Sequence, residues 1–261
     1  MVNRQNTKSN KEASNSKPQH PLSFKALNIL GKCFFGNIFA SKYLLNVDSL
    51  MSKARGKTKL NDFGTDTFYK SFEMLINSLN RDAKLTTVGQ ITIHIILLNS
   101  LIVRLKTQQW VKEHPEVLEE KIEKPFLITG LPRTGTTILS FLLEMDPETR
   151  SLLHWQADNP VPPPQLATMA EDPRIYKCVK NLKLLEKVIP GYQAIHPISA
   201  TIPTECIQLM AHEFKNPFFA MLANISGYLD WIKDADLVQG YLYHKLLLQI
   251  LQSQVPVQTW A

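Results

Sequence analysis

The sequence predicts an α/β fold that is rich in helices and contains part of a parallel sheet. A short apolar stretch, Phe126–Gly130, ends in a glycine-containing loop, and an amphipathic helix follows the loop. Apolar residues recur with helical spacing along most of the remaining chain. Glycine is scarce, with ten in 261 residues, which disfavours a turn-rich β protein. Since strand–loop–helix units belong to parallel sheets, these observations together indicate the α/β class.

The composition is that of an ordinary globular protein, with 44% hydrophobic and 20% charged residues. The net charge of +6 is uneven, because residues 1–60 hold eleven Lys/Arg and two Asp/Glu. The rest of the chain is slightly acidic, so nucleic acid is not expected as a partner of the main domain. Peripheral contact of the basic arm with an anionic membrane surface stays open.

Three cysteines, Cys33, Cys178 and Cys206, show no CxxC spacing. The sequence therefore predicts neither a metal site nor a disulfide framework, and it favours a reduced, cytoplasmic setting. The longest apolar runs, such as Ile91–Val103, are interrupted by polar residues and are shorter than the roughly 20 residues of a membrane helix, so no transmembrane segment is expected. The pattern gives no oligomeric state.

The chain divides into three predicted parts. Residues 1–20 are rich in Asn, Ser and Lys and are expected to form a disordered basic tail. Residues 21–60 are expected to form a basic arm and a linker. The arm is expected to be helical from Pro21 to about Asn46, and an unordered basic link is expected at residues 51–64. Residues 61–261 form the main domain.

Helical periodicity and capping residues predict the helices of the main domain. Their expected spans are Phe68–Asn80, Val88–His114, Thr136–Met145, Pro173–Lys187, Thr204–Ala223 and Asp234–Gln252. The connections are expected to be a polyproline segment at Asn159–Pro164, a loop at Gly191–Pro203 and a short apolar turn at Tyr228–Ile232.

Strands are few in this pattern. Phe126–Gly130 is the one convincing strand, and a second is expected to begin at Val257–Ala261. A phosphate-binding loop works at the edge of a sheet with several parallel strands. The sheet is therefore expected to be incomplete in this chain, which indicates a fragment or truncated product of a longer protein.

The loop after the first strand has the glycine spacing of a phosphate-binding loop. Gly130 and Gly135 are followed by Thr136-Thr137, but the lysine expected directly after the second glycine is absent. The helix N-terminus still offers N–H donors and a partial positive charge. The cation inside the loop is Arg133, whose planar guanidinium pairs well with phosphate or sulfate. This loop suits a phosphosulfate transferred without a metal better than a metal-bridged triphosphate.

The stretch "PFLITGLPRTGTTILSFLLEMDP" resembles the 5′-phosphosulfate loop of sulfotransferases that use 3′-phosphoadenylyl sulfate (PAPS). Other segments, among them "HWQADNPVPPP" and "PTECIQLMAHEF", are similar to the bacterial-type branch of this family that also occurs in some animals. The resemblance covers residues 55–261. It implies a P-loop NTPase-like sulfotransferase fold with a parallel sheet and a helical N-terminal extension.

The resemblance also implies a reaction. PAPS would be the co-substrate, and its sulfuryl group would pass without a metal to a hydroxyl, or an amine, of a small-molecule, carbohydrate or lipid acceptor. The residues implied to hold the phosphosulfate are Arg133, Thr134, Gly135, Thr136 and Thr137.

Two other functions stay open at this point. The family's Lys-Ser-Pro segment and its Arg and Ser for the PAPS 3′-phosphate do not occur in this sequence. The chain is therefore alternatively a non-catalytic binding protein or pseudoenzyme. A P-loop kinase or NTPase is the remaining alternative, which is disfavoured because no lysine follows Gly135.

Sulfuryl transfer needs a base that takes the proton of the acceptor hydroxyl. Glu205 is the first candidate, and a helix-start carboxylate that only favours the helix dipole is the alternative reading. His196 is the second candidate, because an imidazole titrates near neutral pH. Arg133 is expected to offset charge on the leaving phosphate. Trp155 and Pro162–Pro164 are expected either to wall a ligand pocket or to pack across the outer face of the loop. Three further histidines are expected on helix surfaces or in the core: His154, His212 and His244.

Overall fold

The computed structural model describes residues 20–33, 44–131, 134–195, 197–256 and 259–261. The predictions for the basic tail, for Arg133 and for His196 fall on residues outside these ranges. The α-helices are α2 (Leu22–Cys33), α4 (Val47–Thr58), α5 (Thr67–Arg81), α6 (Thr87–Glu113), α7 (Thr136–Glu144), α8 (His154–Asp158), α9 (Pro173–Val188), α10 (Tyr192–Ile195), α11 (Ile207–Met210), α12 (Ser226–Lys233) and α13 (Val238–Gln252). The 3₁₀ helices are η1 (Pro115–Glu119), η2 (Met169–Glu171), η3 (Ala211–Glu213) and η4 (Pro217–Met221), and the strands are β1 (Thr149–Arg150) and β2 (Thr259–Trp260).

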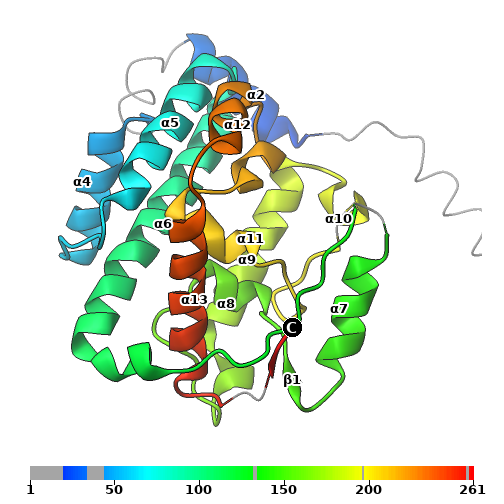
Figure 1. The fold of residues 1–261 in the computed structure, drawn as a ribbon. Helices are drawn as coiled ribbons and strands as arrows, with labels where there is room; N and C mark the ends of the chain where they lie inside the picture. The colour runs from blue at the N-terminus through cyan, green and yellow to red at the C-terminus, as the bar shows by residue number, and fades with distance from the viewer. Residues whose placement is uncertain (1–19, 34–43, 132–133, 196, 257–258) are drawn as a thin grey trace, which may run out of the picture.

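The first half of the described chain forms a helical layer around α6 (Figure 1). α6 begins after Thr86, whose side chain accepts a hydrogen bond from the N–H of Gly89 at 3.1 Å. Its 27 residues make a helix about 40 Å long. α2 and α4 pack on α6, and α12 packs on α5. The helices expected at 68–80, 88–114, 136–145, 173–187 and 234–252 are thereby confirmed, with small shifts at their ends.

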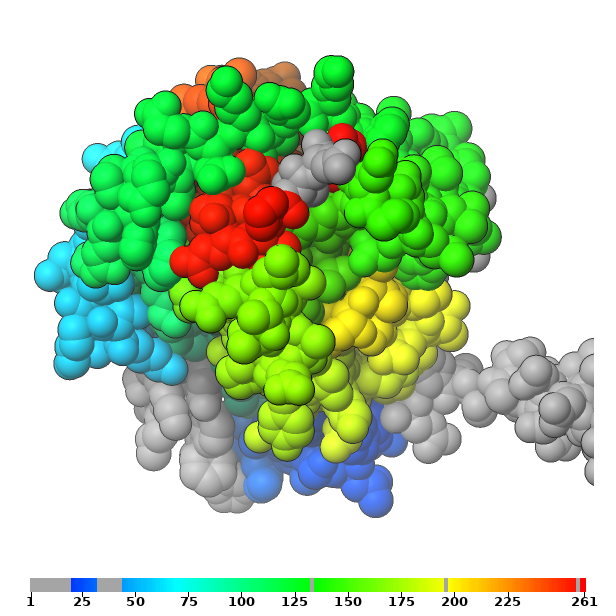
Figure 2. All heavy atoms as spheres, turned by 90° about the horizontal axis from the view of Figure 1, so that it is seen from below, coloured from blue at the N-terminus to red at the C-terminus, as the bar shows by residue number. Residues whose placement is uncertain are grey.

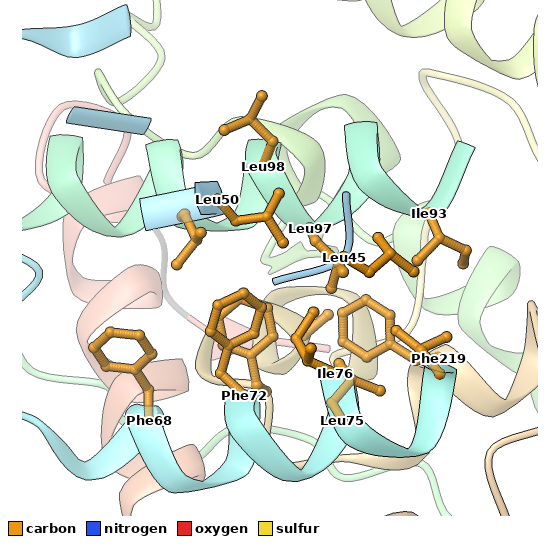
Figure 3. Close-up of a cluster of buried hydrophobic side chains, with 14 of the residues drawn as sticks. Leu45, Leu50, Phe68, Phe72, Leu75, Ile76, Ile93, Leu97, Leu98 and Phe219 are labelled. Carbon is orange, nitrogen blue, oxygen red and sulfur yellow. The ribbon is translucent and has the colours of Figure 1, made fainter. Parts of the chain in front are cut away.

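The main apolar core lies between α5 and α6 (Figure 3). Phe68, Phe72 and Leu75 project from α5 toward α6, which contributes Leu97. Phe219 of η4 belongs to the same cluster and is fully buried. Burying one such side chain stabilises a fold by about 1.5–3 kcal/mol. The helical layer is therefore the tightly packed side of the molecule.

By length and composition alone, α6 is apolar enough to cross a membrane. However, 56% of its most apolar window is buried inside the protein. His94 and Arg104 of this helix are buried as well, and Arg104 forms an ion pair with Glu213. The core helix of a globular protein passes the same test of length and hydropathy, so the burial identifies α6 as a core helix.

The unordered link expected at residues 51–64 is wrong in its first half, because α4 occupies it. Asn46 caps this helix by accepting a hydrogen bond from the N–H of Ser49 at 3.0 Å. Leu50 and Ala54, one turn apart, are both fully buried, and α4 packs on α6. The many basic residues of this stretch obscured a short amphipathic helix in the sequence pattern.

The single helix expected at Thr204–Ala223 is also wrong, since the chain divides it into α11, η3 and η4. Phe214 ends η3 with a φ of 58°, which lies in the left-handed region. Pro217 has no N–H to continue a helical ladder. Asn216 starts the next turn by accepting a hydrogen bond from the N–H of Phe218 at 2.7 Å. The loop expected at 191–203 contains the short helix α10, and the turn expected at 228–232 is part of α12.

β1 and β2 form a two-stranded parallel sheet. β2 lies within the second strand expected at Val257–Ala261. The other expected strand, Phe126–Gly130, is wrong as a regular strand, although it runs beside β2. One backbone hydrogen bond joins the two, from the N–H of Phe126 to the carbonyl of Trp260 at 2.8 Å. β2 offers only two residues for pairing, and no further strand borders the segment in the described part of the chain.

The sheet lies to one side of the helical layer, with α7 beyond it (Figure 1). In the view from below, the C-terminal residues reach the surface between segments from the middle of the chain (Figure 2). The described protein is thus mostly helical, with a small parallel sheet. The segment that leads into the predicted phosphate loop runs beside this sheet.

Candidate functional site

The predicted phosphate loop has the backbone geometry that its two glycines imply. The loop leaves the extended segment 126–130 and turns into α7 at Thr136. Gly135 has φ 93° and ψ 10°, a left-handed conformation that glycine adopts without strain. At Gly130 the chain is crowded, because a Cβ there would lie 2.9 Å from Thr134 Oγ1. The backbone of the turn therefore favours glycine at position 135, and a larger residue at position 130 would crowd the side chains of Thr134 and Thr136.

The start of α7 offers backbone donors to an anion. Its N-cap, Gly135, has no side chain to accept a hydrogen bond from the first turn. The first N–H groups of a helix lack acceptors inside the helix and carry a partial positive charge. Thr134 closes the loop by donating from Oγ1 to the carbonyl of Leu131 at 2.7 Å. A helix N-terminus that follows a glycine in this way is suited to bind phosphate or sulfate.

A cavity of about 410 Å³ opens at this loop. Its loop side is lined by Gly130, Thr136, Thr137 and Ser140. Its other walls carry Glu205 and His244 as polar groups, together with an apolar surface formed by Leu152, Ile207, Leu248 and Trp260. The cavity lies where the carboxyl ends of β1 and β2 meet the loop, which is where parallel α/β sheets bind ligands.

Glu205 reaches this cavity through backbone pairing between distant segments. An antiparallel bridge joins Leu153 to Pro203. The N–H of Thr204 donates to the carbonyl of Leu152 at 2.8 Å. These contacts fix the residues before α11 to the chain that follows β1. The first candidate base and the predicted phosphate loop, which are about 70 residues apart in the sequence, therefore line one cavity.

The charge of Glu205 affects two neighbouring side chains. Burial raises the pKa of the Tyr192 hydroxyl, and the Glu205 carboxylate raises it further. Burial and then the same carboxylate raise the pKa of the Cys206 thiol. Both groups are therefore neutral at pH 7, and Glu205 is the acidic residue on this wall.

The chain is similar to known proteins in sequence and in fold. The model of the Sulfotransferase family matches residues 125–254, which include the loop, Glu205 and His244. The crystal structure of sulfotransferase STF1 from Mycobacterium tuberculosis matches with a TM-score of 0.72 and 30% identity. That of sulfotransferase STF9 from Mycobacterium avium matches with a TM-score of 0.74 and 31% identity. The chain belongs to the sulfotransferase family.

The two matches cover 82% and 83% of this chain, but 60% of STF1 and 56% of STF9. The chain thus spans less than two thirds of the length of either structure. Among curated protein sequences, none matches it significantly. The shared fold and family therefore come from the solved structures and the family model.

His244 lines the candidate site, and the sequence did not predict it there. It lies half-buried on α13 and lines the cavity, instead of occupying a bare helix surface or the core. Burial lowers the pKa of its imidazole, so the ring is neutral at pH 7. Leu248, one turn further along α13, lines the cavity too. The apolar periodicity of α13 is typical of a core helix, so the sequence did not indicate that one of its faces lines a cavity.

The other two histidines differ from His244. His212 is buried as expected, and its Nε2 lies 3.0 Å from the carbonyl oxygen of Ala157. Burial lowers the pKa of His212 as well. His154 is half-buried at the start of α8 and contacts polar side chains of other helices.

Trp155 packs inside the protein and does not wall the cavity, so the pocket alternative is wrong. Its side chain is 1% exposed and packs with Cys178 and Leu182 of α9. The guanidinium of Arg174 lies 4.8 Å from the centre of its ring. The prolines at 162–164 do not line the cavity either. The indole lies against α9, because the apolar side chains Cys178 and Leu182 of α9 face α8.

Among the described residues that line the cavity, none is Lys or Arg. Positive potential there comes from the N-terminus of α7, and the predicted cation, Arg133, lies outside the described residues. A second hollow of about 600 Å³, near Trp260, is lined by mixed charges such as Lys121 and Glu123. It contains no residue of the phosphate loop and is therefore not the candidate site.

Proposed function

We propose that this chain binds PAPS at the loop of residues 130–137 and transfers its sulfuryl group to a hydroxyl or, less favourably, an amine. The observation that supports this most is that one cavity contains both the anion-binding start of α7 and the carboxylate of Glu205. A transferase of this kind needs both an anion site and a base near the acceptor. The residues proposed to hold the phosphosulfate are Arg133, Thr134, Gly135, Thr136 and Thr137.

The proposed role of the loop is to stabilise the negative charge that develops on the leaving phosphate. PAPS supplies a sulfuryl group on a phosphate leaving group. As the bond between sulfur and the phosphate oxygen breaks, negative charge grows on that phosphate. The backbone N–H groups at the start of α7 and the guanidinium of Arg133 are proposed to offset this charge. The N–H groups of α7 need no reorganisation, because that helix is already formed. No lysine follows Gly135, so the loop lacks the side chain that reaches the β- and γ-phosphates of a metal-bridged triphosphate.

Glu205 is proposed as the base that takes the acceptor proton. It is an acidic residue that lines the cavity, and it comes from a segment that the chain after β1 holds in place. His196 remains the second candidate, and its neighbour Pro197 lines the cavity. The neutral imidazole of His244 is proposed to accept a hydrogen bond from the acceptor hydroxyl or to orient it.

The cavity walls indicate the acceptor class. Apart from Glu205 and His244, the residues beside the loop are mainly apolar, including Leu152, Ile207 and Trp260. A pocket of this kind prefers a ligand with an apolar body and a single polar group at its reactive end. We therefore expect a hydrophobic alcohol or phenol, or a lipid hydroxyl, to fit better than a free sugar.

The deciding experiment is calorimetric titration with PAP, the desulfated product nucleotide, beside ATP with Mg²⁺. PAP is expected to bind with an affinity on the order of micromolar, and Arg133→Ala is expected to weaken it about 10- to 100-fold. Lys183→Ala is the matched control, because it removes one positive charge from an exposed position on α9. Its PAP affinity is expected to stay within about twofold of the wild type.

The same titration separates the alternatives. Preference for ATP with Mg²⁺ over PAP would favour a kinase or NTPase. Equal losses in Arg133→Ala and Lys183→Ala would show a diffuse charge effect and contradict the loop site. A folded wild-type chain that binds neither nucleotide would contradict the proposal as a whole.

A further inference from the structure

Three metal-ligating side chains from two helices converge outside the loop cavity. His154 and Asp158 are four residues apart on α8, so both side chains project from the same face. Cys178 comes from α9, which packs against α8. One ligand atom of each residue lies within 4.8 Å of the ligand atoms of the other two. Cys178 is 2% exposed, so the cluster is at the base of the contact between these helices.

Gln208 of α11 marks the point on which two of these groups converge. Its Nε2 lies 2.7 Å from Asp158 Oδ1 and 3.2 Å from His154 Nε2. The carboxylate and the imidazole thus both direct a lone pair at one partly positive amide group. A cation that lies between these groups would accept both lone pairs.

The glutamine can also become a ligand itself. A half-turn about the last bond of its side chain exchanges Nε2 for Oε1, which is a good donor to a metal. Thr204 Oγ1 lies 2.9 Å from Oε1 of Gln208. Because a hydroxyl both donates and accepts, this contact survives the exchange.

We propose that His154, Asp158, Cys178 and Gln208 form a binding site for a divalent cation of the zinc class. Four ligands with one nitrogen, one sulfur and two oxygen donors match tetrahedral Zn²⁺. Mg²⁺ and Ca²⁺ take oxygen ligands, which disfavours them at a site with a thiol and an imidazole. On binding, the thiol of Cys178 gives its proton to solvent and its sulfur bonds to the metal. The thiolate and the carboxylate then balance the charge of the ion.

The backbone holds these ligands in place before any ion binds. The N–H of His154 donates to the carbonyl of Ile202 at 3.2 Å, and that of Trp155 donates to Ala200 at 3.1 Å. α8 is therefore fixed to the segment that leads into α11. A metal at this point would join α8, α9 and the start of α11. It would thereby stiffen the turn that carries Glu205, without taking part in sulfuryl transfer.

Cysteine spacing alone does not predict this metal site. That argument searches for pairs of cysteines close in the sequence. Here a single cysteine on α9 meets a His-x₃-Asp pair on α8 and a glutamine about 50 residues further along the chain. Only the packing of three helices brings these side chains together.

The test is titration of the metal-stripped wild-type chain with Co²⁺, followed by absorbance. One equivalent is expected to give the intense visible bands of tetrahedral cobalt and a thiolate-to-cobalt charge-transfer band. One equivalent of Zn²⁺ is expected to displace the cobalt. Cys178→Ser is expected to lose the charge-transfer band, whereas Cys206→Ser, at the other described free cysteine, is expected to keep it. His154→Ala is expected to weaken cobalt binding at least tenfold.

The wild type alone can overturn the proposal. A folded wild-type chain that gives no cobalt bands and retains no zinc excludes the site. A charge-transfer band that persists in Cys178→Ser would place the metal elsewhere and also contradict it. Circular dichroism of each variant identifies any that fails to fold. Because the readout is optical and needs no nucleotide, the result is independent of whether PAP binds.

Discussion

Glu205 is the residue on which the proposed chemistry depends most directly. Its carboxylate lines the cavity, and its backbone is tied to the chain after β1 by the neighbouring bridge at Pro203. We predict that Glu205→Gln lowers sulfuryl transfer from labelled PAPS about 100- to 10,000-fold, which is the usual contribution of a general base. PAP affinity is expected to stay unchanged, because the substitution leaves the loop intact.

The matched control is Glu171→Gln, which removes an exposed carboxylate outside the cavity and is expected to preserve transfer. Retained transfer in Glu205→Gln would move the role of base to His196 or His244. If the wild type binds PAP and transfers no sulfuryl group to a panel of apolar alcohols and phenols, the chain is a binding protein instead.

Single residues also show what the sequence could predict. The spacing of Gly130 and Gly135 predicted a glycine loop, and the structure shows a left-handed backbone at Gly135 and close side-chain packing at Gly130. Glu205 was predicted from its place at a loop–helix boundary, and it does line the loop cavity. His244 was missed, because a histidine in an apolar helix gives no sequence signal until the helix is packed against the loop.

At the scale of helices and strands, periodicity predicted the longest elements and missed several of the short ones. α5, α6, α9 and α13 have between 15 and 27 residues, so their apolar stripes repeat several times. β1 has two residues, too few for any alternation to be visible. The break after α11 depends on the buried, left-handed Phe214, which is a tertiary effect.

The junction of these helices depends on one buried ion pair. Arg104 of α6 is fully buried and pairs with Glu213 of η3. Its Nη2 also donates to the carbonyl of Phe63 at 2.9 Å, and its guanidinium lies 4.0 Å from the centre of the Phe68 ring. Thr67 at the start of α5 donates to Glu213 at 3.0 Å. The buried ion pair between Arg104 and Glu213 therefore joins α5, α6 and η3, and water does not screen it.

We predict that Arg104→Met lowers the free energy of unfolding by about 3–5 kcal/mol, because it leaves Glu213 buried without its partner. Urea denaturation measures this change. The double variant Arg104→Met with Glu213→Leu is expected to recover part of the loss, since no uncompensated charge remains. Lys70→Met is the matched control, because it breaks an exposed pair with Glu73, and it is expected to cost about 0.5 kcal/mol or less. Equal losses in the two single variants would contradict the importance of the buried pair.

Across the whole molecule, packing is uneven between the helical layer and the loop side. The core between α5 and α6 buries aromatic and aliphatic side chains almost completely. α7 has no buried residue, and β1 is its principal neighbouring element. Large apolar side chains of residues 126–145 are exposed: Phe126, Leu127, Leu131, Ile138, Leu139, Leu142 and Met145. Stretches with few buried contacts open locally at low free energy, whereas core helices open only with global unfolding.

We therefore predict that amide hydrogens of α7 exchange with solvent at least about 100-fold faster than those of α6, because local opening of α7 exposes little buried surface. Hydrogen–deuterium exchange followed by mass spectrometry measures both helices in one sample. Saturating PAP is expected to slow exchange in the first turn of α7 and to leave α6 unchanged, since the anion would occupy those N–H groups. If α7 is instead as protected as α6 without nucleotide, its apolar face is covered in solution. Protection that rises with protein concentration would then identify the cover as a second copy of this chain, because only association depends on concentration.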